Sequence, residues 1–161
     1  WKIDPKRVGV IGFSAGGHLA STISTHYADK VYDVRDNISA RPDFSLLIYP
    51  VISMDTTITH RGSRNNLIGI DPTERNVLRF SNEKQITADT PPAFLVHSSD
   101  DNAVPVMNSI GYYMGLQKKN IPAELHIFQK GGHGYGLAPN GGTESSWPAL
   151  CLKWMKQIGV L

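Results

Sequence analysis

The sequence predicts an α/β fold, a parallel sheet with helices on both faces. The first of four expected strands is Val/Ile-rich and close to continuously apolar, as a strand that is covered on both faces should be. Helical patterns alternate with these strands, which favours parallel strand pairing. The chain has 161 residues, of which 40% are hydrophobic, so residues 1–161 are expected to form one domain with a sizeable core. The expected strands are residues 7–13, 44–49, 93–97 and 124–128, and the expected long helices are residues 15–27, 104–119 and 147–158.

The elements follow one another with clear start and stop signals. The first helix carries Leu19, Ile23 and Tyr27 at helical spacing. Pro50 stops the second strand, and prolines open the two later helices. Between the second and third strands, residues 51–92 are polar, poor in strand signals and long for a connection, with short helices expected at residues 65–68 and 74–79. Connections of this length are usually functional or disordered, so we interpret residues 51–92 as an insertion near the active site.

A glycine-rich turn joins the first strand to the first helix. Gly12-Phe13-Ser14-Ala15-Gly16 matches the G-x-S-x-G nucleophile elbow, in which a strained turn lifts a serine hydroxyl clear of the sheet. The glycines on either side of the serine lack the Cβ atoms that would clash there. The helix start behind Ser14 makes the backbone N–H of Ala15 a natural donor to an oxyanion. Ser14 is therefore the candidate nucleophile.

Other glycine-loop and binding classes do not fit. The loop ends in Gly17-His18-Leu19 rather than the Gly-Lys-Ser/Thr of a P-loop, and its glycines lack the G-x-G-x-x-G spacing of a dinucleotide site. A net charge of +2 and the lack of a basic, aromatic-rich run argue against nucleic-acid binding, and no signal peptide or transmembrane span is visible. The single cysteine, Cys151, is expected to be a core residue. No cofactor and no metal site are expected, and the compartment is left open.

A serine nucleophile needs a base and an acid that orients the base. Asp100 and Asp101 follow the third expected strand, and His133 follows the fourth, within a Gly-rich loop. The chain order Ser, Asp, His is the order of α/β-hydrolases. Loops after the carboxyl ends of parallel strands converge at one edge, where the three side chains can meet. The residues alone leave the choice between Asp100 and Asp101 open.

Three motifs together resemble a known family. G-F-S-A-G-G-H-L-A, S-x-D-D-x-x-V-P-x-x-N-S and G-G-H-G-Y-G-L are similar to the α/β-hydrolase esterases that deacylate plant polysaccharides, the acetyl-xylan and feruloyl-esterase-like group. The resemblance extends from Ile3 to the last helix. In such enzymes the acid usually stands four residues before the Pro of the V-P pair, which implies Asp101 here. Asp100 is then expected to hold the turn or cap the next helix, and it stays the alternative acid.

The chain departs from this family in its first part. Family members carry about half a sheet before the elbow strand, and an H-G-G-type loop that supplies a second oxyanion donor. The chain starts at Trp1 without an initiator Met, so we expect the C-terminal half of an α/β-hydrolase fold. The strand from Val8 to Phe13 would then be an exposed apolar edge, covered by self-association or by a missing N-terminal segment.

The resemblance implies a serine esterase that removes acetyl or feruloyl groups from carbohydrate. One alternative is a serine peptidase of the prolyl-oligopeptidase type, which shares the G-x-S-x-G-G motif and the late Asp and His. The other is a catalytically incomplete fragment with a binding role. No residue is assigned to substrate binding. The remaining histidines are expected to be structural or exposed, with His97 supporting the acid loop; they are His18, His26, His60, His97 and His126. For His60, contact with substrate is the alternative to a solvated loop.

Overall fold

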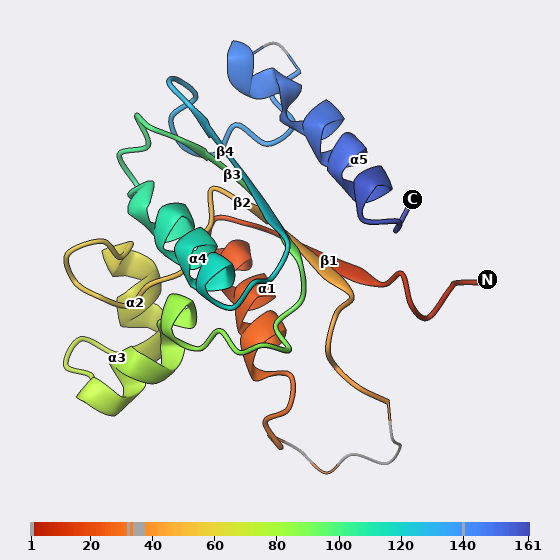
Figure 1. Cartoon of the computed structure of the whole chain (residues 1–161). Helices are drawn as coiled ribbons and strands as arrows, with labels where there is room; N and C mark the ends of the chain where they lie inside the picture. The colour runs from red at the N-terminus through yellow and green to blue at the C-terminus, as the bar shows by residue number, and fades with distance from the viewer. Residues whose placement is uncertain (1, 32, 34–37, 140) are drawn as a thin grey trace.

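The computed structural model describes residues 2–31, 33, 38–139 and 141–161 (Figure 1). Four strands form one parallel sheet in the order β1-β2-β3-β4, so each strand lies beside its neighbour in the chain. The expected α/β class and parallel sheet are confirmed. The strands are β1 (Gly9–Phe13), β2 (Phe44–Ile48), β3 (Ala93–Ser98) and β4 (Ala123–Phe128).

The long helices lie on both faces of this sheet, as expected. α1 (Ala15–His26) and α4 (Met107–Lys118) cover one face, and α5 (Trp147–Gln157) covers the other (Figure 1). The alternation of side chains along β3 shows the two layers. Leu95 packs with Tyr112 and Leu116 of α4, whereas its neighbour Phe94 packs against Trp154 of α5. Each face of a buried strand therefore contributes to a separate apolar core.

The apolar residues at helical spacing on α1 do not face the sheet. Leu19 is 72% exposed and Ile23 is 38% exposed. The helix instead packs through small and polar residues, which let it approach the sheet closely; they are Gly17, His18, Ala20, Ser21 and Ser24. Val8 and Ile11 at β1 are also about half exposed, so β1 is an apolar edge in this sheet, as expected.

Residues 51–92 contain more regular structure than predicted. α2 (Arg61–Ile68) begins four residues before the expected helix, α3 (Glu74–Phe80) matches the expectation closely, and the 3-10 helix η1 (Asn82–Lys84) was not predicted. Side-chain caps explain where α2 and α3 begin, because His60 accepts from Ser63 N–H and Thr73 accepts from Asn76 N–H. The remaining element is the 3-10 helix η2 (Thr143–Ser146), which leads into α5.

Candidate active site

Ser14 lies at the sharp turn between β1 and α1. Its φ of 52° and ψ of −122° place the backbone in a conformation that L-residues rarely adopt. The turn is held by the neighbouring strand: Ser14 N–H donates to the carbonyl of Ile48 at 3.1 Å, and Val51 N–H donates to the carbonyl of Ser14 at 3.0 Å. The strained turn therefore holds Ser14 at the carboxyl edge of the sheet.

Two glycines of the turn are required by close approach. A Cβ on Gly12 would overlap the carbonyl of Gly16, and a Cβ on Gly17 would lie 2.8 Å from the Cα of Pro50. A Cβ on Gly16 would meet no atom within 4 Å beyond its own turn of helix. The steric argument for glycine on both sides of the serine thus applies to Gly12 and not to Gly16.

The structure brings the three predicted side chains into one hydrogen-bonded chain. His133 Nε2 lies 2.8 Å from Ser14 Oγ, and His133 Nδ1 lies 2.6 Å from Asp101 Oδ2. A carboxylate only accepts, so Nδ1 carries the hydrogen and Nε2 is free to accept from the Ser14 hydroxyl. The Asp101 side chain is fully buried, while that of His133 is 23% exposed. This arrangement has the geometry of a nucleophile, a base and an orienting acid.

The second oxygen of Asp101 is bound by its own loop. Asp101 Oδ1 accepts from the backbone N–H of Ala103 at 2.9 Å and of Val104 at 2.8 Å. Asp100 points elsewhere: its Oδ1 accepts from Gly132 N–H at 2.9 Å. Asp100 therefore anchors the loop that carries His133, rather than capping the next helix, and it is Asp101 that contacts the histidine ring.

The loop that carries His133 depends on residues that the sequence analysis missed. The ring of Tyr49 packs edge-on against the His133 ring, with centroids 5.0 Å apart. Its hydroxyl accepts from Gly136 N–H at 3.0 Å, and Trp147 Nε1–H donates to the Gly136 carbonyl at 2.9 Å. Burial raises the pKa of the Tyr49 hydroxyl, which stays neutral as it accepts this bond. The only sequence signal for Tyr49 was its place as the last residue of the second expected strand.

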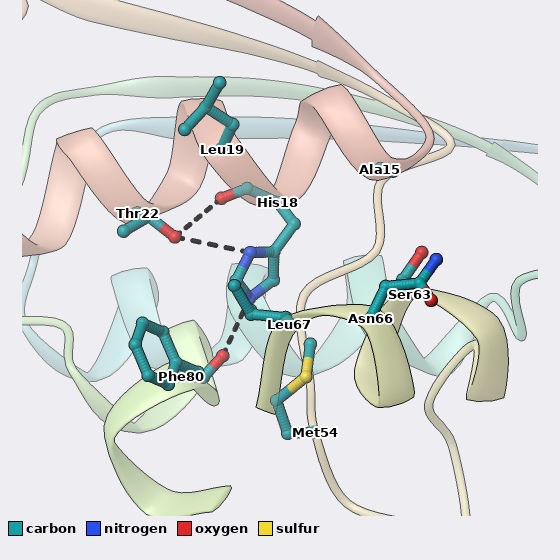
Figure 2. Close-up of a pocket in the computed structure, with 9 residues that line it drawn as sticks. All are labelled: Ala15, His18, Leu19, Thr22, Met54, Ser63, Asn66, Leu67 and Phe80. Atoms are coloured by element: carbon teal, nitrogen blue, oxygen red, sulfur yellow. Dashed lines mark hydrogen bonds between the residues drawn. The ribbon is translucent and has the colours of Figure 1, made fainter. Parts of the chain in front are cut away.

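Ala15 is the first residue of α1, so its N–H has no acceptor within the helix. It also lines a cavity of about 500 Å³ between α1 and α2. Figure 2 shows Ser63, Asn66 and Leu67 of α2 lining this cavity together with residues of α1. The other lining residues are His18, Leu19, Thr22, Met54 and Phe80, so the lining is mainly apolar and holds no formally charged side chain.

The histidines outside the triad make structural contacts. His18 Nε2–H donates to the Phe80 carbonyl at 2.8 Å, which connects α1 to residues 51–92 (Figure 2). Burial lowers the pKa of His18, so the ring is neutral at pH 7. His126 pairs with Glu124 at 2.6 Å, and His60 caps α2. His97 is buried beside Asp101.

Within the described residues, no group of three or more His, Cys, Asp or Glu side chains is arranged to hold a metal ion. In the same part of the chain, no helix is long and apolar enough to cross a membrane.

A parallel sheet that brings a serine, an aspartate and a histidine together at the carboxyl edge of its strands defines an α/β-hydrolase fold. The chain belongs to the prolyl oligopeptidase family, whose model matches residues 2–159. It is 40% identical over 141 residues to an acetylxylan esterase of Xylanibacter ruminicola, covering 85% of this chain and 28% of the relative. It is 38% identical over 144 residues to endo-1,4-beta-xylanase B of Butyrivibrio fibrisolvens, and the match covers 86% of this chain and 22% of the relative.

Solved structures show the same likeness. An acetyl ester-xyloside bifunctional hydrolase from Caldicellulosiruptor lactoaceticus has a TM-score of 0.92 at 46% identity, covering 99% of this chain and 59% of that one. The carboxylesterase Cest-2923 from Lactobacillus plantarum has a TM-score of 0.81 at 25% identity, and the match covers 99% of this chain and 61% of that one. The chain thus spans about a quarter of the curated relatives and about three-fifths of these structures. The predicted resemblance to acetyl-xylan esterases is confirmed.

Proposed function

We propose that this chain carries the catalytic triad of a serine carboxylic-ester hydrolase that removes acetyl or feruloyl groups from carbohydrate. The observation that carries the proposal is the continuous chain of contacts from Ser14 through His133 to Asp101, at 2.8 and 2.6 Å. The acetyl-ester and acetylxylan names of the relatives support the substrate class.

The proposed reaction runs through an acyl-enzyme. Ser14 Oγ attacks the ester carbonyl while its proton passes to His133 Nε2. The oxyanion forms beside the N–H of Ala15, and Asp101 stabilises the charged imidazole. When the C–O bond breaks, His133 returns the proton to the leaving alcohol. Water then attacks the acyl group with His133 again as base, which releases the carboxylic acid and restores Ser14.

Hydrolysis of p-nitrophenyl acetate by the purified chain tests this proposal. We expect turnover that Ser14→Ala abolishes, because the variant lacks the nucleophile and keeps the fold. Acetylated xylan is the second substrate. Turnover equal to that of Ser14→Ala would overturn the proposal. Stoichiometric labelling of Ser14 by an active-site phosphonate reports an activated nucleophile independently of the ester chosen, and its failure would favour the alternative of an incomplete fragment with a binding role.

Peptidase activity is the second candidate, because the family is described as prolyl oligopeptidases. The nucleophile, base and acid would be the same residues, so the leaving group distinguishes the two functions. A comparison of an aminoacyl-proline amide with an acetate ester decides between them. We expect kcat/KM to be higher for the ester, and a higher value for the amide would favour the peptidase.

We further propose that residues 51–92 form one wall of the substrate site within the single domain. The cavity at Ala15 supports this, because Met54, Ser63 and Leu67 line it opposite α1. Leu67→Trp would fill the cavity from the exposed face of α2. We expect the KM for a bulky ester to rise while that for acetate changes little. Equal effects on both esters would contradict a role of this wall in substrate choice.

We also propose that the β1 edge is covered in the functional protein, by self-association or by a further N-terminal segment. The half-exposed side chains of Val8 and Ile11 support this, because they lie at β1, an edge strand that pairs with β2 on one side only among the described residues. Sedimentation at micromolar concentration is expected to show a dimer or larger species. Ile11→Lys should shift it to monomer, whereas a wild-type monomer would exclude self-association of this chain.

A further inference from the structure

Two histidines contact the same oxygen of the triad aspartate. His97 Nε2 lies 3.2 Å from Asp101 Oδ2, the atom that His133 Nδ1 contacts at 2.6 Å. The His97 side chain is fully buried, as is that of Asp101. The carboxylate is therefore placed between one histidine that reaches Ser14 and another that is buried behind it.

The hydrogen bonds of His97 determine its tautomer. Its Nε2 lies 2.9 Å from the Val104 carbonyl, which only accepts, so the hydrogen is on Nε2. Its Nδ1 lies 2.8 Å from Ser109 Oγ and accepts from that hydroxyl. Burial lowers the pKa of His97 in spite of the opposing bond to Val104 and the charge of Asp101, so the ring is a neutral N–H donor.

We propose that His97 is a positioning residue, whose ring is aligned by Ser109 and whose single Nε2–H, shared between the Val104 carbonyl and Asp101 Oδ2, holds the Asp101 carboxylate in the orientation that His133 requires. The inference rests on the proposed hydrolase function of the triad. Val104 connects Asp101 with His97, because its N–H donates to Asp101 Oδ1 and its carbonyl accepts from His97. The carboxylate is thereby held at both oxygens: by backbone N–H groups at Oδ1, and by the two histidines at Oδ2.

A purely structural histidine would affect stability alone, so the test needs a signal from the triad itself. We would label the chain with ¹⁵N-histidine and record imidazole spectra at about pH 6, near the ordinary pKa of histidine. In the wild type we expect His97 to carry a hydrogen on Nε2 and none on Nδ1. We also expect a strongly downfield signal for the His133 Nδ1 hydrogen, which is bonded to Asp101. A protonated Nδ1 on His97 would overturn the proposal.

Substitutions at His97 and Ser109 then test whether His97 affects the hydrogen bond between His133 and Asp101. His97→Leu should shift or broaden the His133 Nδ1–H signal, whereas His97→Gln should restore it in large part, because its amide places an N–H near the position of Nε2. Ser109→Ala keeps the ring and removes only its alignment, so it should change the signal in the same direction even if His97→Leu fails to fold. An unchanged His133 signal in folded His97→Leu or Ser109→Ala would overturn the proposal.

His126→Gln is the matched control. His126 lies on β4, contacts Glu124, and has no contact with Asp101, so the same chemical change there should leave the His133 signal unchanged. In turnover, His97→Leu is expected to lower kcat about 10-fold with KM unchanged, the size of effect of losing one hydrogen bond to a charged group. An equal kcat would count against positioning. If the wild type lacks esterase turnover, the proposed function fails, and the ¹⁵N spectra still decide the role of His97.

Discussion

His133 Nε2 lies 2.8 Å from Ser14 Oγ, although 119 positions separate the two residues in the chain. They follow β1 and β4, the two edge strands of the sheet, which stand roughly 14 Å apart at the usual strand spacing. The loop after β4 therefore returns across β3 and β2 to reach the serine. Tyr49 and Asp100 bind this loop on its way, through Gly136 and Gly132.

Strain at Ser14 predicts a trade between stability and activity. Ser14→Gly should raise the free energy of unfolding by about 1 kcal/mol, because glycine adopts a positive φ without penalty. Ser14→Ala should not, since alanine keeps the Cβ. Chemical denaturation of both variants measures the difference, and both should lack turnover. Equal stability of the glycine and alanine variants would show that the turn is not strained.

The adjacent aspartates should respond very differently to loss of charge. Asp101→Asn should lower kcat by roughly 10⁴, the effect seen when the orienting acid of a serine hydrolase becomes an amide. Asp100→Asn is the matched control and should lower kcat far less, because asparagine keeps a side-chain oxygen that accepts from Gly132 N–H. Steady-state hydrolysis of an acetate ester measures both. The opposite order would make Asp100 the acid.

Burial of two histidines predicts loss of stability in mild acid. Burial lowers the pKa of His18 and of His97 in the folded protein, so the unfolded chain binds more protons below about pH 6.5. Their contribution is present above that pH and is lost as the pH falls through the folded pKa values. Glu83 acts in the opposite direction, because burial raises its pKa. Thermal unfolding between about pH 7.5 and 5 should show a decline that is shallower in His18→Gln.

Cys151 should be unreactive in the folded protein. The side chain is buried in the core under α5, and burial raises the pKa of its thiol to about 11. A thiol reagent at about pH 8 should therefore modify it slowly in the native state and rapidly in denaturant. The ratio of the two labelling rates measures this protection. Comparable rates would mean that α5 opens readily from the sheet.

The residues of the candidate site were predictable to an uneven degree. The elbow turn and the late histidine carry short signals at strand ends, so Ser14 and His133 could be singled out from local pattern, whereas the choice of Asp101 over Asp100 came from the family resemblance. The face of α1 that meets the sheet was not predictable, because periodicity records where apolar residues recur and not which surface of the helix packs. In this structure α1 packs closely against the sheet through its small and polar residues, and the side chain of Leu19 is exposed to solvent.

The sequence by itself determined the order of the elements, the parallel class and the candidate nucleophile, because these depend on apolar runs, glycine turns and spacing along the chain. Only the tertiary structure decided which aspartate oxygen meets His133, that Tyr49 packs against its ring, and that His97 lies behind Asp101. These contacts join residues on different strands and loops. No local propensity encodes them, since they arise when the sheet brings distant loops to one edge.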